Sequence, residues 1–505
     1  MGLRDFTLYD VISRNRRTAP GRTAFVTEGE RITHAEYAAR VDCLASGLLQ
    51  AGLRSGERIG VLSENCLEYV LLYGAVARIG AILVPMNWRA SADEIAYAIT
   101  DTKPRLLVAG DNHVELIDSM RDRLPFVDRF FSLGNTPLPF ESFARLMACG
   151  TDVPAAAVTA DAPYLILHTA AVDGRPRGAV LTHGSMIAGS MQLIHHWRLN
   201  QTDVNLCMLP LFHVAGLGAL LATQQAGGAS VLLPRFDAEV AVGFIRRDRV
   251  TLTGVFPPML SRLLDSAAGS PADLASLRTL SGLDTPETIA RFETTCPDAR
   301  FWVGYGQSEV SGYVALGQFR DRPGSVGLPT LHSHVAVLDE SGHELPPGVS
   351  GEIAIRGPNV FDSYWNLPAE TAETHRHGWH HSGDLGRFDE DGYLWFERRS
   401  PAKELIKPGG ENVYPAEVER VLRQHPAIAE AVVIGVPDPE WGEAIKAVCV
   451  LRPNHAVDEQ LVIEFVAARL ARLKKPRHVV FVDQLPVTAD GTIDRAGVKA
   501  MHGVA

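Results

Sequence analysis

Along most of the chain, hydrophobic residues form two alternating patterns, one with helical spacing and one of short continuous runs. Apolar residues at positions 37, 41, 44 and 48 recur at helical spacing behind a capping box formed by Thr33 to Glu36. Short apolar runs bounded by turn residues predict buried strands at 58–62, 81–84, 105–108, 164–167, 230–233, 251–255 and 301–303. Strands that alternate with helices in this way predict a mostly parallel α/β domain.

The pattern changes after about residue 330. Strands predicted at 334–338, 352–356 and 393–397 follow one another closely, with Gly, Pro and Asp turns between them, which favours a small antiparallel β unit. A polar stretch that meets a proline at 398–401 marks a linker. Beyond it, a small α+β unit is predicted, with a helix after Pro415, strands at 431–436, 447–451 and 478–482, and a helix near 459–473. We therefore expect domains at 1–402 and 403–505.

Composition and charge narrow the classes of function. A chain of 505 residues, 46% hydrophobic and 21% charged, is globular in character and exceeds the ~250–300 residues of a single core. The net charge of -11 offers no basic surface for nucleic acid. Six scattered cysteines without a CxxC pair predict neither a disulfide framework nor a zinc site. No apolar run approaches the ~20 residues of a membrane span, and the first residues lack an apolar signal core, so a cytoplasmic protein is expected.

One glycine-containing segment, TAAVDGRPRG from Thr169 to Gly178, follows a predicted strand and precedes a predicted helix at 185–197. A turn in that place holds phosphate through backbone N–H groups in many proteins. On its own, an ordinary turn is the commoner explanation for two glycines and a proline.

Further motifs change that balance. They are PLFH at 210–213, GYGQSE at 304–309, WHHSGD at 379–384, KELIKPGGENVYPAEVE at 403–419, WGE at 441–443 and KKP at 474–476. In order and spacing they resemble the adenylate-forming superfamily of acyl-CoA synthetases, stand-alone adenylation domains and luciferases, over nearly the whole chain. The resemblance implies a large N-terminal domain and a small, mobile C-terminal domain that turns at a hinge near Lys403.

The resemblance also implies a binding site for AMP. The matching residues are Gly304, Tyr305, Gly306, Ser308, Asp384 and Arg399, with Arg398 as a substitute for the last. Asp384 would accept hydrogen bonds from the ribose hydroxyls, and Tyr305 would stack on adenine. Core packing is the alternative for Tyr305, and a solvated turn is the alternative for Asp384. Glu309 matches a Mg²⁺ ligand. Enzymes of this family first form an acyl-adenylate from acid and ATP and then transfer the acyl group to a thiol, and this second half-reaction need not require the metal.

Other matches concern the acceptor, coenzyme A. The residues implied to act at the thioester step are His213, Gly409, Gly410 and the hinge Lys403, and those implied to bind CoA are Trp441, Lys475 and Arg477. His213 would gate the acyl and pantetheine channel, and glycines would leave that channel open. The alternative for His213 is a buried histidine with its hydrogen bonds satisfied, and the alternative for the two glycines is a plain turn. Trp441 could instead be structural, and Lys475 and Arg477 could be ordinary surface charges.

The phosphate loop departs from the family pattern TSGTTGxPKG. The residues of this degenerate loop are Thr169, Ala170, Ala171, Val172, Asp173, Gly174 and Arg177. Lost hydroxyls matter because a hydrogen bond to a charged group contributes about 1.5–3 kcal/mol. Asp173 also adds a negative charge where polyphosphate would sit.

Two further departures follow. In the family, a motif like PxTxxGKIxR supplies a lysine that bridges the carboxylate and the α-phosphate, but here Thr492 occupies that position and cannot balance the developing charge. The loop at 281–286 is also shorter than the family's, so the pocket shape cannot be carried over.

The residues that this chain has lost are those that the family uses for adenylation. The residues that match the AMP and CoA sites are retained. This combination resembles the non-adenylating acyl-CoA ligases associated with diterpenoid antibiotics of the platensimycin type, in which a separate enzyme supplies the acyl-adenylate. The expected reaction converts acyl-adenylate and CoA to acyl-CoA and AMP, on a bulky hydrophobic acid for which small residues at 214–218 leave room. A complete ATP-dependent ligase, a catalytically dead binding protein and a carrier-protein acceptor remain alternatives.

Overall fold

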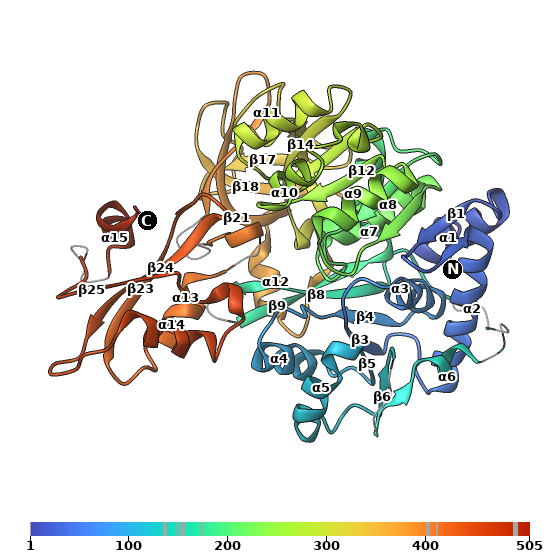
Figure 1. Ribbon diagram of the computed structural model, residues 1–505, viewed down its shortest axis with the longest axis horizontal. Coiled ribbons are helices and arrows are strands. Elements are labelled where there is room, and N and C mark those ends of the chain that lie inside the picture. The colour runs from blue at the N-terminus through green and yellow to red at the C-terminus, as the bar shows by residue number, and fades with distance from the viewer. Residues whose placement is uncertain are drawn as a thin grey trace.

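The computed structural model describes residues 2–134, 139–148, 150, 153, 157–172, 175–399, 405–410, 413–487 and 493–504. Two large sheets with their helices form the right-hand part of Figure 1, and a small sheet with three helices forms the left-hand part. This is the predicted mixed α/β architecture with a large N-terminal and a small C-terminal domain.

The first large sheet has, among the described residues, eight strands in the order β19-β9-β8-β4-β3-β5-β6-β7. Pairs from β8 to β7 are parallel, and β9 pairs antiparallel with β8 and β19. The strands are β3 (Arg58–Leu62), β4 (Ile82–Pro85), β5 (Leu106–Ala109), β6 (Arg129–Ser132), β7 (Glu141–Ser142), β8 (Pro163–Val172), β9 (Arg175–Thr182) and β19 (Ser363–Tyr364).

The second large sheet follows the order β16-β15-β14-β13-β12-β10-β11-β1-β2, nine strands within the described ranges. Its interior pairs are parallel and its outer pairs antiparallel. The strands are β1 (Thr23–Val26), β2 (Arg31–Thr33), β10 (Val204–Cys207), β11 (Ala229–Leu232), β12 (Leu252–Val255), β13 (Thr279–Gly282), β14 (Arg300–Gln307), β15 (Gly312–Gln318) and β16 (Leu328–Pro329).

Helices cover both large sheets. Two of them, α3 and α8, are apolar all round and lie in the main core with residues of both sheets, as helices without a polar face must. The predicted capping box is present at the start of α2, where Glu36 N–H donates to Thr33 Oγ1 and Thr33 N–H donates to Glu36. The helices are α1 (Leu8–Thr18), α2 (His34–Gln50), α3 (Leu67–Ile79), α4 (Ala92–Thr102), α5 (Val114–Met120), α6 (Ala144–Met147), α7 (His183–Trp197), α8 (Val214–Ala226), α9 (Ala238–Asp248), α10 (Met259–Ser266) and α11 (Pro286–Thr295).

The predicted small antiparallel unit follows, with helix α12 (Pro368–Thr374) beside it. Its strands are β17 (His334–Leu338), β18 (Gly351–Arg356), β20 (His375–Arg376), β21 (Trp379–Phe388) and β22 (Leu394–Arg399).

The C-terminal domain has its own core. Strand β24 pairs antiparallel with β23 and parallel with β25. The elements are α13 (Pro415–Leu422), β23 (Ile428–Asp438), β24 (Gly442–Leu451), α14 (Glu459–Ala467), β25 (His478–Val482) and α15 (Arg495–His502). No helix in the described ranges is long and apolar enough to cross a bilayer.

The structure differs from the expectation at two places. The helix expected near 459–473 ends at Ala467, and a 3₁₀ turn, η7 (Arg472–Lys474), follows after a short non-helical stretch. Leu473 and Lys474 of this turn line a cavity between the domains, and Lys474 pairs there with Glu94 of the N-terminal domain. The segment expected as a loop at 169–178 is largely extended, since Thr169 pairs with Arg177 across β8 and β9.

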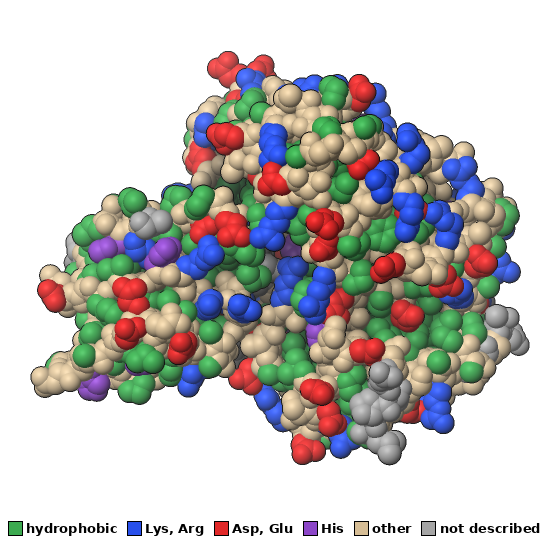
Figure 2. All heavy atoms as spheres, in the orientation of Figure 1, with side chains coloured by type: hydrophobic (Ala, Val, Ile, Leu, Met, Phe, Trp, Pro, Cys, Tyr) green, Lys and Arg blue, Asp and Glu red, His purple; other side chains and the backbone are tan. Residues whose placement is uncertain are grey.

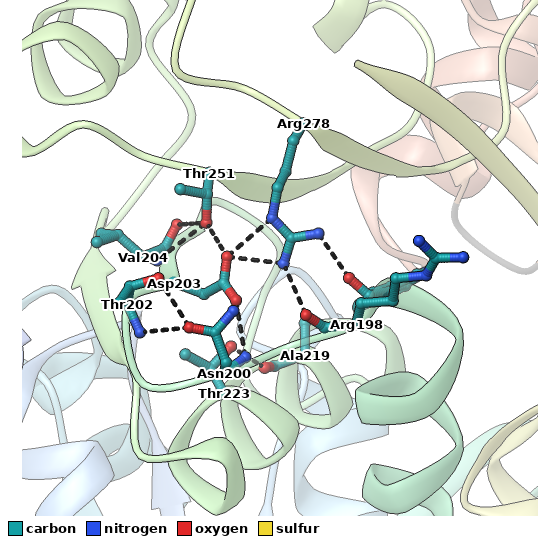
Figure 3. Close-up of polar contacts among 10 residues, drawn as sticks. Arg198, Asn200, Thr202, Asp203, Val204, Ala219, Thr223, Thr251 and Arg278 are labelled. Atoms are coloured by element: carbon teal, nitrogen blue, oxygen red, sulfur yellow. Dashed lines mark hydrogen bonds and ion pairs between the residues drawn. The ribbon is translucent and has the colours of Figure 1, made fainter. Parts of the chain in front are cut away.

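A buried charge cluster ties together the amino ends of β10, β12 and β13 (Figure 3). Asp203, only 2% exposed, receives hydrogen bonds from Arg278 at 2.7 Å, from Thr251 at 2.8 Å and from the backbone N–H of Asn200 at 2.8 Å. Because the Asp203 carboxylate is paired with Arg278 and hydrogen-bonded by Thr251 and Asn200, its negative charge can be buried. The carboxyl ends of the same strands stay open, which is where parallel sheets place ligand sites.

Candidate active site

Two cavities share His213 as a lining residue. The central cavity, of about 290 Å³, is lined from both domains, including Gly218 of α8, Gly304 and Gly306 of β14, and Lys474 of the C-terminal domain. The side cavity, of about 260 Å³, is lined by Pro257 and by Gly409 and Trp441 of the C-terminal domain. His213 lines both. Figure 2 shows a hollow between the two parts of the molecule with Lys and Arg side chains around it.

His213 is the residue before α8 and is only partly buried. Its Nδ1 accepts a hydrogen bond from the backbone N–H of Ala215 at 3.2 Å, which fixes the ring at the helix start. The His213 side chain therefore takes part in a hydrogen bond that holds it at the helix start, and it also lines both cavities. This position suits the gating role that the resemblance implies.

Gly409 lies in the 3₁₀ turn η6 (Pro408–Gly410) with a left-handed backbone, φ 57°. Its N–H donates to the backbone oxygen of Trp441 at 3.0 Å. A Cβ at this position would lie 2.6 Å from the Trp441 ring and 3.4 Å from the backbone oxygen of Pro257. Glycine is thus required by close packing of η6 on Trp441 and on the N-terminal domain, a reason different from the expected filling of an open channel.

Trp441 packs against Gly409 and borders the side cavity. Arg477 lies above the Trp441 ring at 6.0 Å and pairs with Asp438 at 2.6 Å on an exposed surface. Lys475 is half-buried. CoA binding by these three residues stays a prediction.

A buried ion-pair network joins the two domains at the wall of the central cavity. Lys474 contacts Glu417 at 2.8 Å within the C-terminal domain and also pairs with Glu94 of α4. Burial lowers the pKa of Lys474, but attraction to the two carboxylates outweighs it and raises that pKa. For Glu417 burial dominates and raises the pKa. At Glu94 burial also acts to raise the pKa, but the Lys474 charge together with hydrogen bonds from Lys474 and Ser91 outweighs it and lowers that pKa. Arg262 and Glu440 form a second, exposed bridge between the domains at 2.9 Å.

The expected AMP residues divide into two groups. Gly304, Gly306 and Ser308 line the central cavity, as does Glu309, the expected Mg²⁺ ligand. Both glycines are also demanded by packing, because a Cβ at Gly304 would meet the Tyr313 ring at 2.6 Å and one at Gly306 would meet the Gly312 oxygen at 1.9 Å.

Tyr305 and Asp384 lie behind that wall. Asp384 is fully buried and accepts hydrogen bonds from Tyr305 Oη at 2.7 Å and from Gln307 Nε2 at 2.8 Å. Tyr305 is 6% exposed and packs in a core cluster beside Phe396. Their roles toward adenine and ribose remain predictions, and the core packing of Tyr305 is evident.

Glu309 is held by Tyr364, whose Oη donates to the carboxylate at 2.9 Å. Burial and then the charge of Glu309 raise the pKa of Tyr364, so this phenol stays a donor. Arg177 of β9 lies over the Tyr364 ring at 5.5 Å. A single carboxylate on a cavity wall fits Mg²⁺, which takes one or two protein carboxylates and completes its shell with water and phosphate.

Several predicted residues cannot be placed. Asp173, Gly174, Lys403 and Thr492 lie outside the described residues. Roles for Ala170, Ala171, Val172, Arg399 and Gly410 likewise stay predictions. Beyond Thr492 the chain belongs to the C-terminal domain, because Arg495 pairs with Glu419 at 2.7 Å, and α15 lies at the outer end of that domain (Figure 1).

The sequence reasoning missed the network of Glu94, Lys474 and Glu417. Lys474 stands in the KKP motif, but its neighbour Lys475 was preferred as the functional residue. Glu94 carries no local signal, since 380 positions separate it from Lys474.

Family models match most of the chain. A model described as AMP-binding enzyme matches residues 12–365, and one described as AMP-binding enzyme C-terminal domain matches residues 417–492.

Individual proteins are similar along their full length. An indoleacetate–CoA ligase of Aromatoleum aromaticum is 34% identical over 502 residues, covering 98% of each chain. The fatty acid–[acyl-carrier-protein] ligase ScoC of Streptomyces coeruleorubidus is 34% identical and covers 98% of this chain and 96% of its own. Among solved structures, the amide bond synthetase McbA from Marinactinospora thermotolerans superposes with a TM-score of 0.89 at 28% identity, over 99% of this chain and 100% of its own.

Proposed function

This chain belongs to the AMP-binding enzyme family and is an acyl-CoA ligase, and from that premise we propose that it is specialised for the second half-reaction. Acyl-adenylate and CoA give acyl-CoA and AMP, while little acyl-adenylate is made from acid and ATP. The observation that carries the proposal is the side cavity, which is lined by Gly409 and Trp441 and shares His213 with the lining of the central cavity.

The chemistry of this step asks for positioning above all. The CoA sulfur attacks the acyl carbon, a C–S bond forms, the bond from that carbon to the phosphate oxygen of AMP breaks, and the thiol proton passes to solvent. AMP is a good leaving group, so holding the thiol near the acyl carbon supplies most of the acceleration. The C-terminal domain contributes Gly409 and Trp441 to the wall of the side cavity, which supports the proposal that the thiol arm of CoA enters there.

Weak adenylation is argued from the altered residues. Thr492 stands where a lysine would balance charge, and Ala170 to Asp173 replace hydroxyls and a glycine that would hold the β- and γ-phosphates. Losses exceeding ~5 kcal/mol correspond to roughly 10⁴-fold in rate. We propose that a separate enzyme supplies the acyl-adenylate, and that Mg²⁺ at Glu309 is dispensable for thioester formation.

The deciding experiment compares two substrates for the pure protein. One reaction contains acid, ATP, Mg²⁺ and CoA, and the other contains the synthetic acyl-adenylate and CoA. We expect acyl-CoA from the adenylate at a rate at least about 10³-fold higher. Robust acid-dependent ATP–pyrophosphate exchange would contradict the proposal.

A complete ATP-dependent ligase is the second candidate, and the full-length similarity to an enzyme named as a CoA ligase favours it. Exchange in the same experiment would establish it. The relative named as an acyl-carrier-protein ligase makes a carrier-protein thiol the alternative acceptor, which a competition between CoA and a phosphopantetheinylated carrier would test. A catalytically inactive binding protein would bind the adenylate and produce no thioester.

The acid itself is proposed as bulky and hydrophobic, with a polycyclic diterpenoid acid as one candidate. A Cβ at Gly218 would have only Leu193 Cδ1, at 3.8 Å, within reach, so α8 leaves space in the central cavity at that point. A cytoplasmic location remains a prediction.

A further inference from the structure

One part of the central cavity combines apolar walls with buried hydroxyl groups. Leu193 of α7 and Gly218 of α8 supply apolar surface, and the same cavity is lined by Ser311 and Tyr313, on the segment that enters and begins β15. Tyr313 packs on the same core cluster as Leu193. We call these four residues the acyl pocket.

Ser311 has a hydroxyl that the fold does not use. The residue is 3% exposed, and its Oγ has no hydrogen-bond partner among the described residues. Buried hydroxyls are nearly always bonded, because desolvation without a partner is costly. The backbone of Ser311 is left-handed, φ 55°, where glycine is the easier residue. A serine at such a position, on a cavity wall, points to a use for its side chain.

Tyr313 offers a second hydroxyl. Its Oη lies 3.2 Å from Ser281 Oγ, and either oxygen can be the donor of that bond. Burial raises the pKa of Tyr313, so the phenol keeps its proton. With Ser281 as one partner, Tyr313 still has capacity for one more hydrogen bond from the cavity side.

We propose that Ser311 and Tyr313 bind a hydroxyl or carbonyl oxygen carried by the acyl group. The preferred acid then has a bulky apolar skeleton with one oxygenated position, and a plain hydrocarbon acid of the same shape is a poor substrate. This inference rests on the proposed binding of the acyl-adenylate in the central cavity. A site built to bond a substrate hydroxyl discriminates strongly against the analogue that lacks it, because its own polar groups are then left unpaired.

The test uses matched pairs of acyl sulfamoyl adenosines, which mimic the adenylate and do not react. The pairs are phenylpropanoyl with its para-hydroxy derivative, decanoyl with its terminal hydroxy derivative, and a tricyclic diterpenoid acyl group with and without one ring hydroxyl. Calorimetry on the full chain gives each Kd, and the corresponding acyl-adenylates are assayed with CoA. We expect at least one oxygenated member to bind about tenfold or more tightly than its partner.

Variants assign the preference to the two residues. In Ser311→Ala and Tyr313→Phe, the preference is expected to fall to within about threefold, while the plain member keeps its affinity. Ser311→Gly removes the same oxygen and suits the left-handed backbone, so it reports on Oγ even if Ser311→Ala folds poorly. Ser119→Ala, an exposed serine of α5, is the matched control.

The outcomes separate this inference from the proposed function. Turnover of the adenylates without preference in any pair, or a preference that survives all three variants, overturns the inference and leaves the proposed function standing. Failure of every adenylate to bind and to react overturns both.

Discussion

We assign CoA to the side cavity and the phosphates of ATP to the β8–β9 hairpin, and the two regions place different demands on their residues. The side cavity is defined by shape, with Gly409 pressed on Trp441 and on Pro257. The hairpin depends on chemistry, and at 170–173 it lacks the hydroxyls that polyphosphate would need. A channel remains open as long as its small residues are not replaced by larger ones. Phosphate binding, in contrast, is abolished when a few hydroxyl-bearing side chains are replaced. One half-reaction is therefore separable from the other.

The largest effect is expected at the side cavity. Gly409→Leu should slow thioester formation from acyl-adenylate by about 100-fold, because the new side chain must displace Trp441 or the C-terminal domain. Calorimetry should show nearly unchanged binding of a nonreactive adenylate analogue. Gly243→Leu on α9, where a Cβ meets nothing within 4 Å, is the control. An equal loss of binding would assign Gly409 to the nucleotide site or to folding.

Repair of the hairpin should have the next largest effect. Thr492→Lys alone is expected to raise ATP–pyrophosphate exchange by less than about threefold, since groups that act on one transition state are not additive. Joined with Ala170→Ser, Ala171→Gly, Val172→Thr and Asp173→Thr, it should raise exchange by about tenfold or more. Near-normal exchange in the single variant would show that the hairpin is competent as it stands.

A smaller effect is expected at the contact between the domains. Lys474→Met removes the partner of two buried carboxylates and should weaken the observed arrangement, lowering turnover on acyl-adenylate by about fivefold. Glu94→Gln should have a similar effect, and Lys103→Met, at an exposed lysine just after α4, should be neutral. Unchanged turnover together with a lower melting temperature would give the network a purely structural role.

The hinge should matter least. An enzyme that performs only the thioester step has no need to alternate between two domain arrangements, so Lys403→Pro is expected to cost less than about twofold on acyl-adenylate. The same steady-state assay measures it. A severe loss, with folding intact by circular dichroism, would mean that the domain must still turn during the cycle.

Much of the fold was predictable because local patterns carry it. Thr33 and Glu36 cap a helix through neighbours in sequence, and β3 and β17 occupy the predicted ranges. The prediction was wrong at 459–473, where the helix ends at Ala467 and Leu473 and Lys474 stand in a separate 3₁₀ turn that lines the cavity between the domains. At Thr169 the expected loop is extended because it pairs with Arg177 across a hairpin.

By itself, the sequence determined the family and the motif residues, since Gly304, Gly306 and Glu309 are conspicuous by type and spacing. Only the tertiary structure decided what those residues touch. It placed Asp384 and Tyr305 together behind the cavity wall, pressed Gly409 on Trp441, and joined Glu94 to Lys474 across the domains. It also left the Ser311 hydroxyl buried without a hydrogen-bond partner among the residues that the structure describes. The physical reason is the separation of the interacting residues along the chain. A motif consists of residues a few positions apart, whereas burial and pairing depend on residues that are tens to hundreds of positions apart.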